Sequence, residues 1–345
     1  MSRRFPPARP PHARLLLLLL IVSAGSVAAC ANDADDDDAR PPALPPGMMP
    51  PPTTNADATP PAVPFSPATP RVHARAAGSW PHDPEAYTQG LLVHDGRLLE
   101  GTGLEGHSEL REVDVASGRA RRRTPTPSGR FCEGLAVLGD RIYQLTWLAK
   151  RGHVYDLATL QPVDSFTYEG EGWGLAADGR LLYMSDGTSR IRVVDPKHGF
   201  QVQRTIQVTE GGTPVHALNE LEWVRGELWA NVYRTDYVAR IDPTSGHVVG
   251  WLDLGGLLSP EERRAVEGRG GVANGIAFDS ARNRVLVTGK YWPRLFQLDP
   301  PPIAASERRG SQRPDPSTPR AAANPANVAA SESSTLATAY DAARQ

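Results

Sequence analysis

Five segments of the chain share one pattern of apolar and polar positions. Each begins with a polar or aromatic residue beside Gly or Glu, continues into a short apolar run, turns at Gly, Asp or Asn, and returns as a second apolar run. The segments are QGLLVHDGRLLEGTG, EGLAVLGDRIYQLTW, WGLAADGRLLYMSDG, NELEWVRGELWANVY and NGIAFDSARNRVLVTGK. Short apolar runs between turn residues are typical of β-strands, so each segment predicts a hairpin.

A third strand follows each hairpin and ends near an Asp, in LREVDV, GHVYDL, IRVVDP, VARIDP and LFQLDP. The pattern recurs at intervals of about 40 to 55 residues, which is typical of the blades of a β-propeller. The fifth repeat lacks a fourth strand, while RVHARAAGSW before the first repeat has no place in a blade. We therefore predict an all-β fold, a five-bladed β-propeller whose ring is closed by this N-terminal strand completing the last blade.

Residues 1–30 have the pattern of an export signal. Arginines precede a leucine-rich run that is too short for a secure membrane span and ends in VAAC. This end resembles a bacterial lipobox, which would make Cys30 the lipidated first residue of the mature chain. An ordinary signal peptide, cleaved after the small residues, is the alternative. Both predict an exported protein, either periplasmic or anchored to an envelope membrane as a lipoprotein.

Two further segments have compositions that cannot bury a core. Residues 31–70 contain an acidic run followed by many prolines, and residues 301–345 are rich in Pro, Ala and Ser. Such compositions predict a disordered tether and a disordered tail. The propeller, which would be the catalytic domain of an enzyme, is therefore expected over residues 71–300.

Composition and charge change this prediction little. The 345 residues are 40% hydrophobic with a net charge of −2, which allows a large core and gives no charge excess that would favour nucleic acid. Cys132 is the only cysteine of the predicted propeller, so no internal disulfide can form there. With no His close by in the sequence, we interpret it as a small buried hydrophobic residue and not as a nucleophile.

The innermost strand of a propeller blade lines the central channel, and the residue just before its Gly or Glu is expected at the channel mouth. The five residues at this position are Gln89, Glu133, Trp173, Asn219 and Asn274. One carboxylate, several amides and a Trp predict a small polar pocket with an aromatic wall. The recurring Gly would allow the five backbones to approach one another closely.

The pieces YTQGL, EGL, YQLTW, WGL, SDG, LNELEW, WANVY and VTGKYWP occur in this order over about residues 72–299. Together they resemble the plant and bacterial type of glutaminyl-peptide cyclotransferase. The resemblance implies an acyltransferase that converts an N-terminal Gln of peptides or proteins to pyroglutamate and releases ammonia. It implies Glu133 as the general acid and base, with Lys290 and Asn219 matching residues that would stabilise the oxyanion.

The resemblance also implies a substrate pocket. Gln89 matches an active-site glutamine that would hold the substrate amide or α-amine, and Trp147 and Trp173 match pocket tryptophans that would bracket the substrate side chain. Tyr233 stands where the family often has Trp, which keeps an aromatic wall and adds a hydroxyl. Cys132 stands where the family often has Gly, a departure that affects the shape of the loop.

No spacing of metal ligands is compelling in the sequence. The resemblance implies that no cofactor is required, although it allows a structural calcium ion. We expect a monomer whose partners are peptides or proteins with N-terminal Gln. It would bind no nucleic acid and would reach a membrane only through its N-terminal lipid.

Two other function classes remain open at this point. A metal-dependent propeller hydrolase of the lactonase type would use Glu133, Asn219, Glu220 and Asn274 as ligands; five repeats in place of six and the Trp-lined pocket disfavour it. A non-catalytic propeller could display a binding surface on the cell envelope. A lone acid enclosed by aromatic residues, a lysine and amides disfavours this second class.

Overall fold

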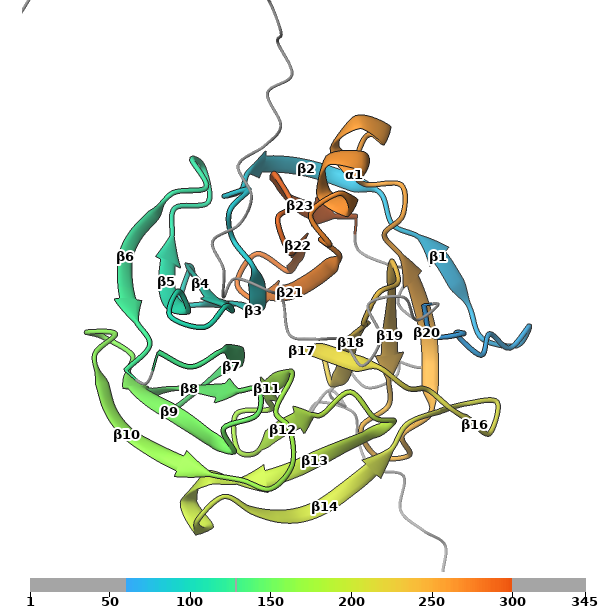
Figure 1. Ribbon diagram of the computed structural model, residues 1–345. Helices are drawn as coiled ribbons and strands as arrows, with labels where there is room; N and C mark the ends of the chain where they lie inside the picture. Colours follow the sequence, from blue (N-terminus) through green and yellow to red (C-terminus); the bar gives the residue numbers. More distant parts are fainter. Residues whose placement is uncertain (1–59, 128, 300–345) are drawn as a thin grey trace, which may run out of the picture. The chain divides into compact units, whose positions relative to one another are not determined.

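The computed structural model describes residues 60–127 and 129–299 (Figure 1). In this part of the chain five sheets surround a common axis, which confirms the predicted five-bladed β-propeller. The predicted export signal, the lipidation of Cys30, most of the tether and the tail lie outside the described residues and stay predictions. No described helix is long and apolar enough to cross a membrane.

The first three blades each consist of four consecutive antiparallel strands, and the first strand of each is innermost. Blade one contains β3 (Thr88–His94), β4 (Arg97–Thr102), β5 (Glu109–Val113) and β6 (Ala120–Pro125). Blade two contains β7 (Cys132–Leu138), β8 (Arg141–Thr146), β9 (Arg151–Asp156) and β10 (Pro162–Thr167). Blade three contains β11 (Leu175–Ala177), β12 (Leu182–Ser185), β13 (Arg190–Asp195) and β14 (Gln201–Gln207), with a 3-10 turn at Pro196–His198.

The last two blades also use the N-terminal segment. Blade four contains β17 (Leu218–Val224), β18 (Glu227–Val232), β19 (Tyr237–Ile241) and β20 (Val248–Asp253), and it follows a small ribbon of β15 (Thr209–Glu210) and β16 (Thr213–Pro214). Blade five contains β21 (Ala273–Asp279), β22 (Arg284–Gly289) and β23 (Arg294–Leu298). The helix α1 (Pro260–Glu267) lies between these blades and begins with a capping box of Ser259 and Glu262.

The N-terminal segment predicted as one strand forms two strands in different blades. The second, β2 (Ala76–Pro81), pairs antiparallel with β23 and completes blade five as predicted. The first, β1 (Arg71–His73), pairs in parallel with β20 on the outer edge of blade four. Between them, Ala74 N donates to the carbonyl of Asp253, and Asp299 N donates to the carbonyl of Arg75. One segment therefore joins two neighbouring blades.

Residues 60–70, expected as the end of a disordered tether, pack against blade four. The ring of Phe65 lies edge-on to Tyr237 and Trp251, with centroid distances of 4.8 and 5.4 Å. Backbone and hydroxyl groups of the same segment donate hydrogen bonds to the carboxylate of Glu210. The predicted start of the folded domain was therefore too late, because this proline-rich stretch carries one aromatic anchor and donors that find a buried acceptor.

Glycines allow the innermost strands to meet around the axis. A Cβ atom on Gly134 would lie 2.5 Å from the backbone nitrogen of Leu175, which no side chain tolerates. A Cβ atom on Gly90 or Gly174 would also meet backbone atoms of the next innermost strand, at 2.7 and 2.0 Å. These positions require glycine, as the repeated pattern predicted, because backbone stands directly where a side chain would begin.

The aspartates that end the third strands fix the turns that lead to the outermost strands. In blades one to four the carboxylate accepts a hydrogen bond from a backbone N–H two or three residues further on. The four residues are Asp114, Asp156, Asp195 and Asp242. A short side chain that caps its own turn explains why this position repeats in the sequence.

Candidate active site

The candidate residues lie at bulges in the innermost strands. In β7 the register with β8 shifts between Cys132 and Leu135, so Glu133 and Gly134 face a single residue of the partner strand. β3, β17 and β21 shift at the equivalent place. The residues at those shifts are Gln89, Asn219 and Asn274. A bulge bends a strand and re-aims its side chains, which explains how a regular blade presents functional groups at the axis.

Glu133 and Lys290 are both buried and influence each other electrostatically. Their exposed fractions are 4% and 2%. Burial raises the pKa of Glu133 well above its usual range and the nearby Glu171 adds to this, while Lys290 opposes it. Burial lowers the pKa of Lys290 to about 8, and Glu133 opposes this shift. Glu133 therefore binds a proton more tightly, and Lys290 less tightly, than either side chain does in water.

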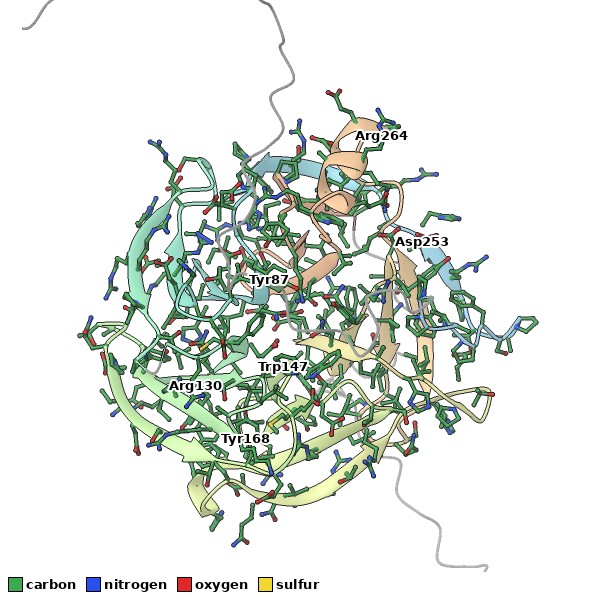
Figure 2. The ribbon with its side chains drawn as sticks, viewed as in Figure 1. Tyr87, Arg130, Trp147, Tyr168, Asp253 and Arg264 are labelled. Carbon is green, nitrogen blue, oxygen red and sulfur yellow. The ribbon has the colours of Figure 1, made fainter. Side chains whose placement is uncertain are left out.

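Two tyrosines enclose the ammonium group of Lys290. Its Nζ lies 4.5 Å from the ring centroid of Tyr87 and 4.9 Å from that of Tyr233. Such cation–π contacts replace part of the hydration that burial removes. Tyr87, which is labelled near the axis in Figure 2, was not among the predicted site residues. It stands two residues before Gln89 in the YTQGL motif.

The tryptophans Trp147 and Trp173 are half-buried and share one hydrogen-bond acceptor. Both indole N–H groups donate to Oε2 of Glu171, at 2.7 and 2.9 Å. The ring of Trp173 also lies edge-on to Tyr233, with centroids 5.5 Å apart. The structure thus places the predicted aromatic residues in one wall and adds Glu171, which the sequence analysis missed. The feature of the sequence that could have indicated Glu171 is its position two residues before Trp173, in EGWGL.

Three amide side chains complete the polar part of the site. Asn274 Nδ2 donates to Oε1 of Gln89 at 3.1 Å and to the carbonyl of Thr88 at 2.9 Å. Gln89 also carries an NH₂ group, which can donate to a ligand. Asn219 Oδ1 is buried and accepts no hydrogen bond from a described residue. A ligand that donates to Asn219 would satisfy this buried oxygen.

Glu220, which replaces the axial glycine in blade four, has a structural role. Its two carboxylate oxygens accept hydrogen bonds from the backbone nitrogens of Leu91, at 3.2 Å, and Ile276, at 2.9 Å. It thereby joins blade four to blades one and five across the axis. Among the residues that the structure describes, no three His, Cys, Asp or Glu side chains are grouped to hold a metal ion.

Cys132 is buried next to Glu133. Burial raises the pKa of its thiol to about 12, and its Sγ lies 3.1 Å from Thr126 Oγ1. A thiol that stays protonated at neutral pH is a poor nucleophile. These observations agree with its interpretation as a small packing residue.

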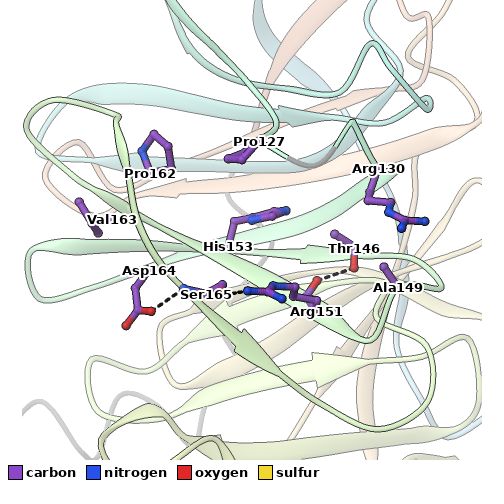
Figure 3. Close-up of a pocket in the computed structure, with 10 residues that line it drawn as sticks. All are labelled: Pro127, Arg130, Thr146, Ala149, Arg151, His153, Pro162, Val163, Asp164 and Ser165. Carbon is purple, nitrogen blue, oxygen red and sulfur yellow. Dashed lines mark hydrogen bonds between the residues drawn. The ribbon is translucent and has the colours of Figure 1, made fainter.

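A hollow of about 620 Å³ lies on the side of blade two and is separate from this site (Figure 3). Its lining includes Arg130, Arg151 and His153 and contains none of the predicted site residues. The guanidinium of Arg151, in β9, donates to Ser165 in the neighbouring strand β10. We place the candidate active site at the axis, where the predicted residues meet, and not in this hollow.

Comparison with known proteins points to one family. The family model described as glutamine cyclotransferase matches residues 52–299. A glutaminyl-peptide cyclotransferase of Arabidopsis thaliana is 42% identical over 224 residues, which are 64% of this chain and 68% of the plant protein. The crystal structure of Myxococcus xanthus glutaminyl cyclase is similar with a TM-score of 0.61 and 36% identity, over 67% of this chain and 97% of the Myxococcus chain.

Proposed function

The chain belongs to the glutamine cyclotransferase family, and from that premise we propose that Glu133 moves the proton in the family's reaction. The chain is a glutaminyl-peptide cyclotransferase, which converts N-terminal Gln of peptides and proteins to pyroglutamate and releases ammonia. This membership favours an enzyme over the binding propeller and the metal-dependent hydrolase. One observation carries the role of Glu133: it is a buried axial carboxyl whose proton affinity is set by burial and two charges.

The reaction is an internal aminolysis that needs one group to accept and return a proton. The α-nitrogen of the substrate forms a bond to the side-chain amide carbon, and the bond from that carbon to the amide nitrogen then breaks. Glu133 accepts a proton from the attacking nitrogen and gives it to the leaving nitrogen, which departs as ammonia. A carboxyl with a raised pKa is a stronger base and holds the proton long enough for the second step.

The remaining residues bind and orient the substrate. Lys290 supplies a positive charge for the oxyanion that develops on the amide oxygen, since its pKa of about 8 leaves it largely protonated at neutral pH. Asn219 and Gln89 offer an acceptor and a donor for the amine and amide of the substrate. Trp147, Trp173 and Tyr233 form walls that hold a flat side chain folded back on its own amine and exclude water.

Ammonia release from a short peptide with N-terminal Gln tests this proposal. In the mature full-length protein, we expect Glu133→Gln to lower the rate by about 10²-fold or more without lowering the melting temperature. Glu105→Gln, in an exposed turn of blade one, is the matched control and should keep wild-type activity. A Glu133→Gln enzyme that keeps more than about a tenth of the wild-type rate would contradict the role of Glu133.

The proposal extends to cofactors and location. We propose that the enzyme requires no cofactor, so EDTA should leave ammonia release unchanged; a loss that calcium restores would contradict this. We also propose an exported monomer with lipid on Cys30, and the pattern of residues 1–30 supports it. The mass of the mature N-terminal peptide distinguishes a lipidated Cys30 from simple signal cleavage, and sedimentation measures the oligomeric state.

A further inference from the structure

One carboxylate oxygen ties together two tryptophans from different blades. Trp147 follows the last residue of β8 in blade two, and Trp173 stands two residues before β11 in blade three. Oε2 of Glu171 accepts from the indole nitrogen of each, at 2.7 and 2.9 Å. Hydrogen bonds to an ionised acceptor are stronger than those between neutral groups. The relative position of the two rings therefore depends on this side chain.

The turn that carries Glu171 is itself held in place. Arg192, from β13, donates to the backbone carbonyls of Glu169 and Glu171. Gly172 N donates to the carbonyl of Trp147 at 3.2 Å, and Trp173 N donates to the carbonyl of Ser185 at 3.0 Å. The backbone that carries the carboxylate is thus fixed. If the Glu171 side chain were shortened, the turn could not move to restore the hydrogen bonds to the two indoles.

Glu171 also contributes to the electrostatic environment of Glu133. The groups that interact with Glu133 are Lys290, Glu171, Cys132, Tyr87, Tyr168 and Tyr233. Lys290 favours the ionised form of Glu133, whereas the negative charge of Glu171 raises its pKa. The remaining four groups are neutral at pH 7, because burial raises the pKa of each.

We propose that Glu171 is a positioning residue of the enzyme, which holds Trp147 and Trp173 as the walls of the substrate pocket and places a negative charge within electrostatic range of Glu133. The positioning of the two tryptophans by Glu171 does not depend on which residue transfers the proton. The second part rests on the proposed role of Glu133 in proton transfer. Glu171 acts through these three side chains and does not itself take part in the chemistry.

Two variants separate the two effects. Glu171→Gln keeps an oxygen with two lone pairs, which can accept from both indoles, and removes only the charge. We expect its KM for a Gln peptide to stay within about 2-fold of wild type. The acid limb of its kcat should move to lower pH, because without the Glu171 charge Glu133 stays ionised further into acid. The same peptide is used with both enzymes, so any shift belongs to the enzyme.

Glu171→Ala removes both hydrogen bonds. We expect kcat/KM to fall by about 10²-fold, mainly through KM, because small displacements of a substrate-holding wall are costly. Quenching of tryptophan fluorescence by iodide should increase, since two released indoles become more accessible. Glu169→Gln is the matched control: it lies on the same turn, is exposed, and its side chain pairs only with Lys150 among the described residues.

The possible outcomes decide each part separately. Wild-type KM and quenching in Glu171→Ala, with an unchanged melting temperature, would overturn the positioning role. An equal rise of KM in Glu171→Gln and Glu171→Ala would also overturn it, since the hydrogen bonds would then not matter. An unmoved acid limb in Glu171→Gln would overturn the electrostatic part. If Glu133→Gln stays active, the proton-transfer assignment fails, while KM and quenching still test the positioning role. Should Glu171→Ala not fold, Glu171→Leu takes its place, because it removes both hydrogen-bond acceptors and keeps most of the side-chain volume, and its KM and quenching against Glu169→Gln decide the positioning role.

Discussion

Replacing Glu100 by Gln should weaken the closure of the propeller ring in a pH-dependent way. His82 directly follows the closing strand β2, and its Nε2 lies 3.0 Å from Glu100 Oε1 in blade one. The other ring nitrogen lies 2.7 Å from the carbonyl of Trp292. Thr88 donates to the same carboxylate at 2.7 Å, and Arg111 Nε lies 3.4 Å from its second oxygen. This cluster joins blade one to the closing strand and to the turn that carries Lys290.

The magnitude follows from the pKa of Glu100. Burial alone would raise it, but the charges of His82 and Arg111 and the hydrogen bonds lower it from 4.5 to about 2. At about 1.4 kcal/mol per pKa unit, the ionised carboxylate contributes about 3 kcal/mol to the free energy of unfolding. Its side chain is only 1% exposed, so solvent screening does not reduce this value.

The sign of the pH dependence is set by the direction of the shift. Because the folded-state pKa of Glu100 is lowered, its contribution is present above pH 4.5 and is lost as the pH falls toward about 2. For His82, burial opposes the charge, but Glu100 and the two hydrogen bonds raise the pKa. That contribution is complete below the ordinary histidine pKa and is lost as the pH rises through the raised value.

Urea unfolding of wild type and Glu100→Gln over a pH series measures the effect. We expect the variant to be less stable by about 3 kcal/mol near neutral pH, with a difference that shrinks as the pH approaches 2. Glu105→Gln, exposed in the same blade, should unfold like wild type throughout. A difference that is absent at neutral pH, or that does not change with pH, would refute the electrostatic reasoning.

Two further predictions concern the active site. Lys290→Met should lower kcat by about 10²-fold or more, because it removes a donor to the oxyanion. In wild type, kcat should also fall above about pH 8, where Lys290 loses its proton, and the variant should lack this fall. A pH–rate profile whose alkaline limb is unchanged in the variant would argue against this role. Cys132 should resist iodoacetamide at neutral pH until urea unfolds the protein, because burial raises the pKa of its thiol to about 12; peptide mass spectrometry reads the labelling, and rapid modification of the native protein would contradict its buried role.

Local patterns were enough to predict the blades and the axis. Short apolar runs and turn residues repeat because every blade packs between two neighbouring blades in the same way. Gly134 is required because the backbone of the next innermost strand lies directly against it. The break between β1 and β2 could not be predicted in this way. It depends on backbone hydrogen bonds with Asp253, the last residue of β20, and Asp299, which directly follows β23. Nothing in RVHARAAGSW itself marks the crossing.

Site residues could be predicted where they occupy the repeated position of a blade. They could not be predicted where their role depends on contacts with side chains of other blades. Glu133 and Asn219 stand at the repeated position before the axial Gly or Glu, and the bulges there explain their placement. Tyr87 and Glu171 each stand two residues before the repeated position, where the five blades share no residue type. Their contacts with Lys290 and with the tryptophans depend on how neighbouring blades meet, which no local pattern encodes.

The two strands that flank the crossing at residues 74–75 also constrain the order of folding. β1 and β2 are the first strands of the domain to be synthesised, but their partners β20 and β23 are among the last. Contacts so distant in sequence carry a large loop-closure cost and slow the folding of β-proteins. Until β20 and β23 have been synthesised, β1 and β2 have no partner strand. This interval is when the chain is most exposed to pairing with another molecule.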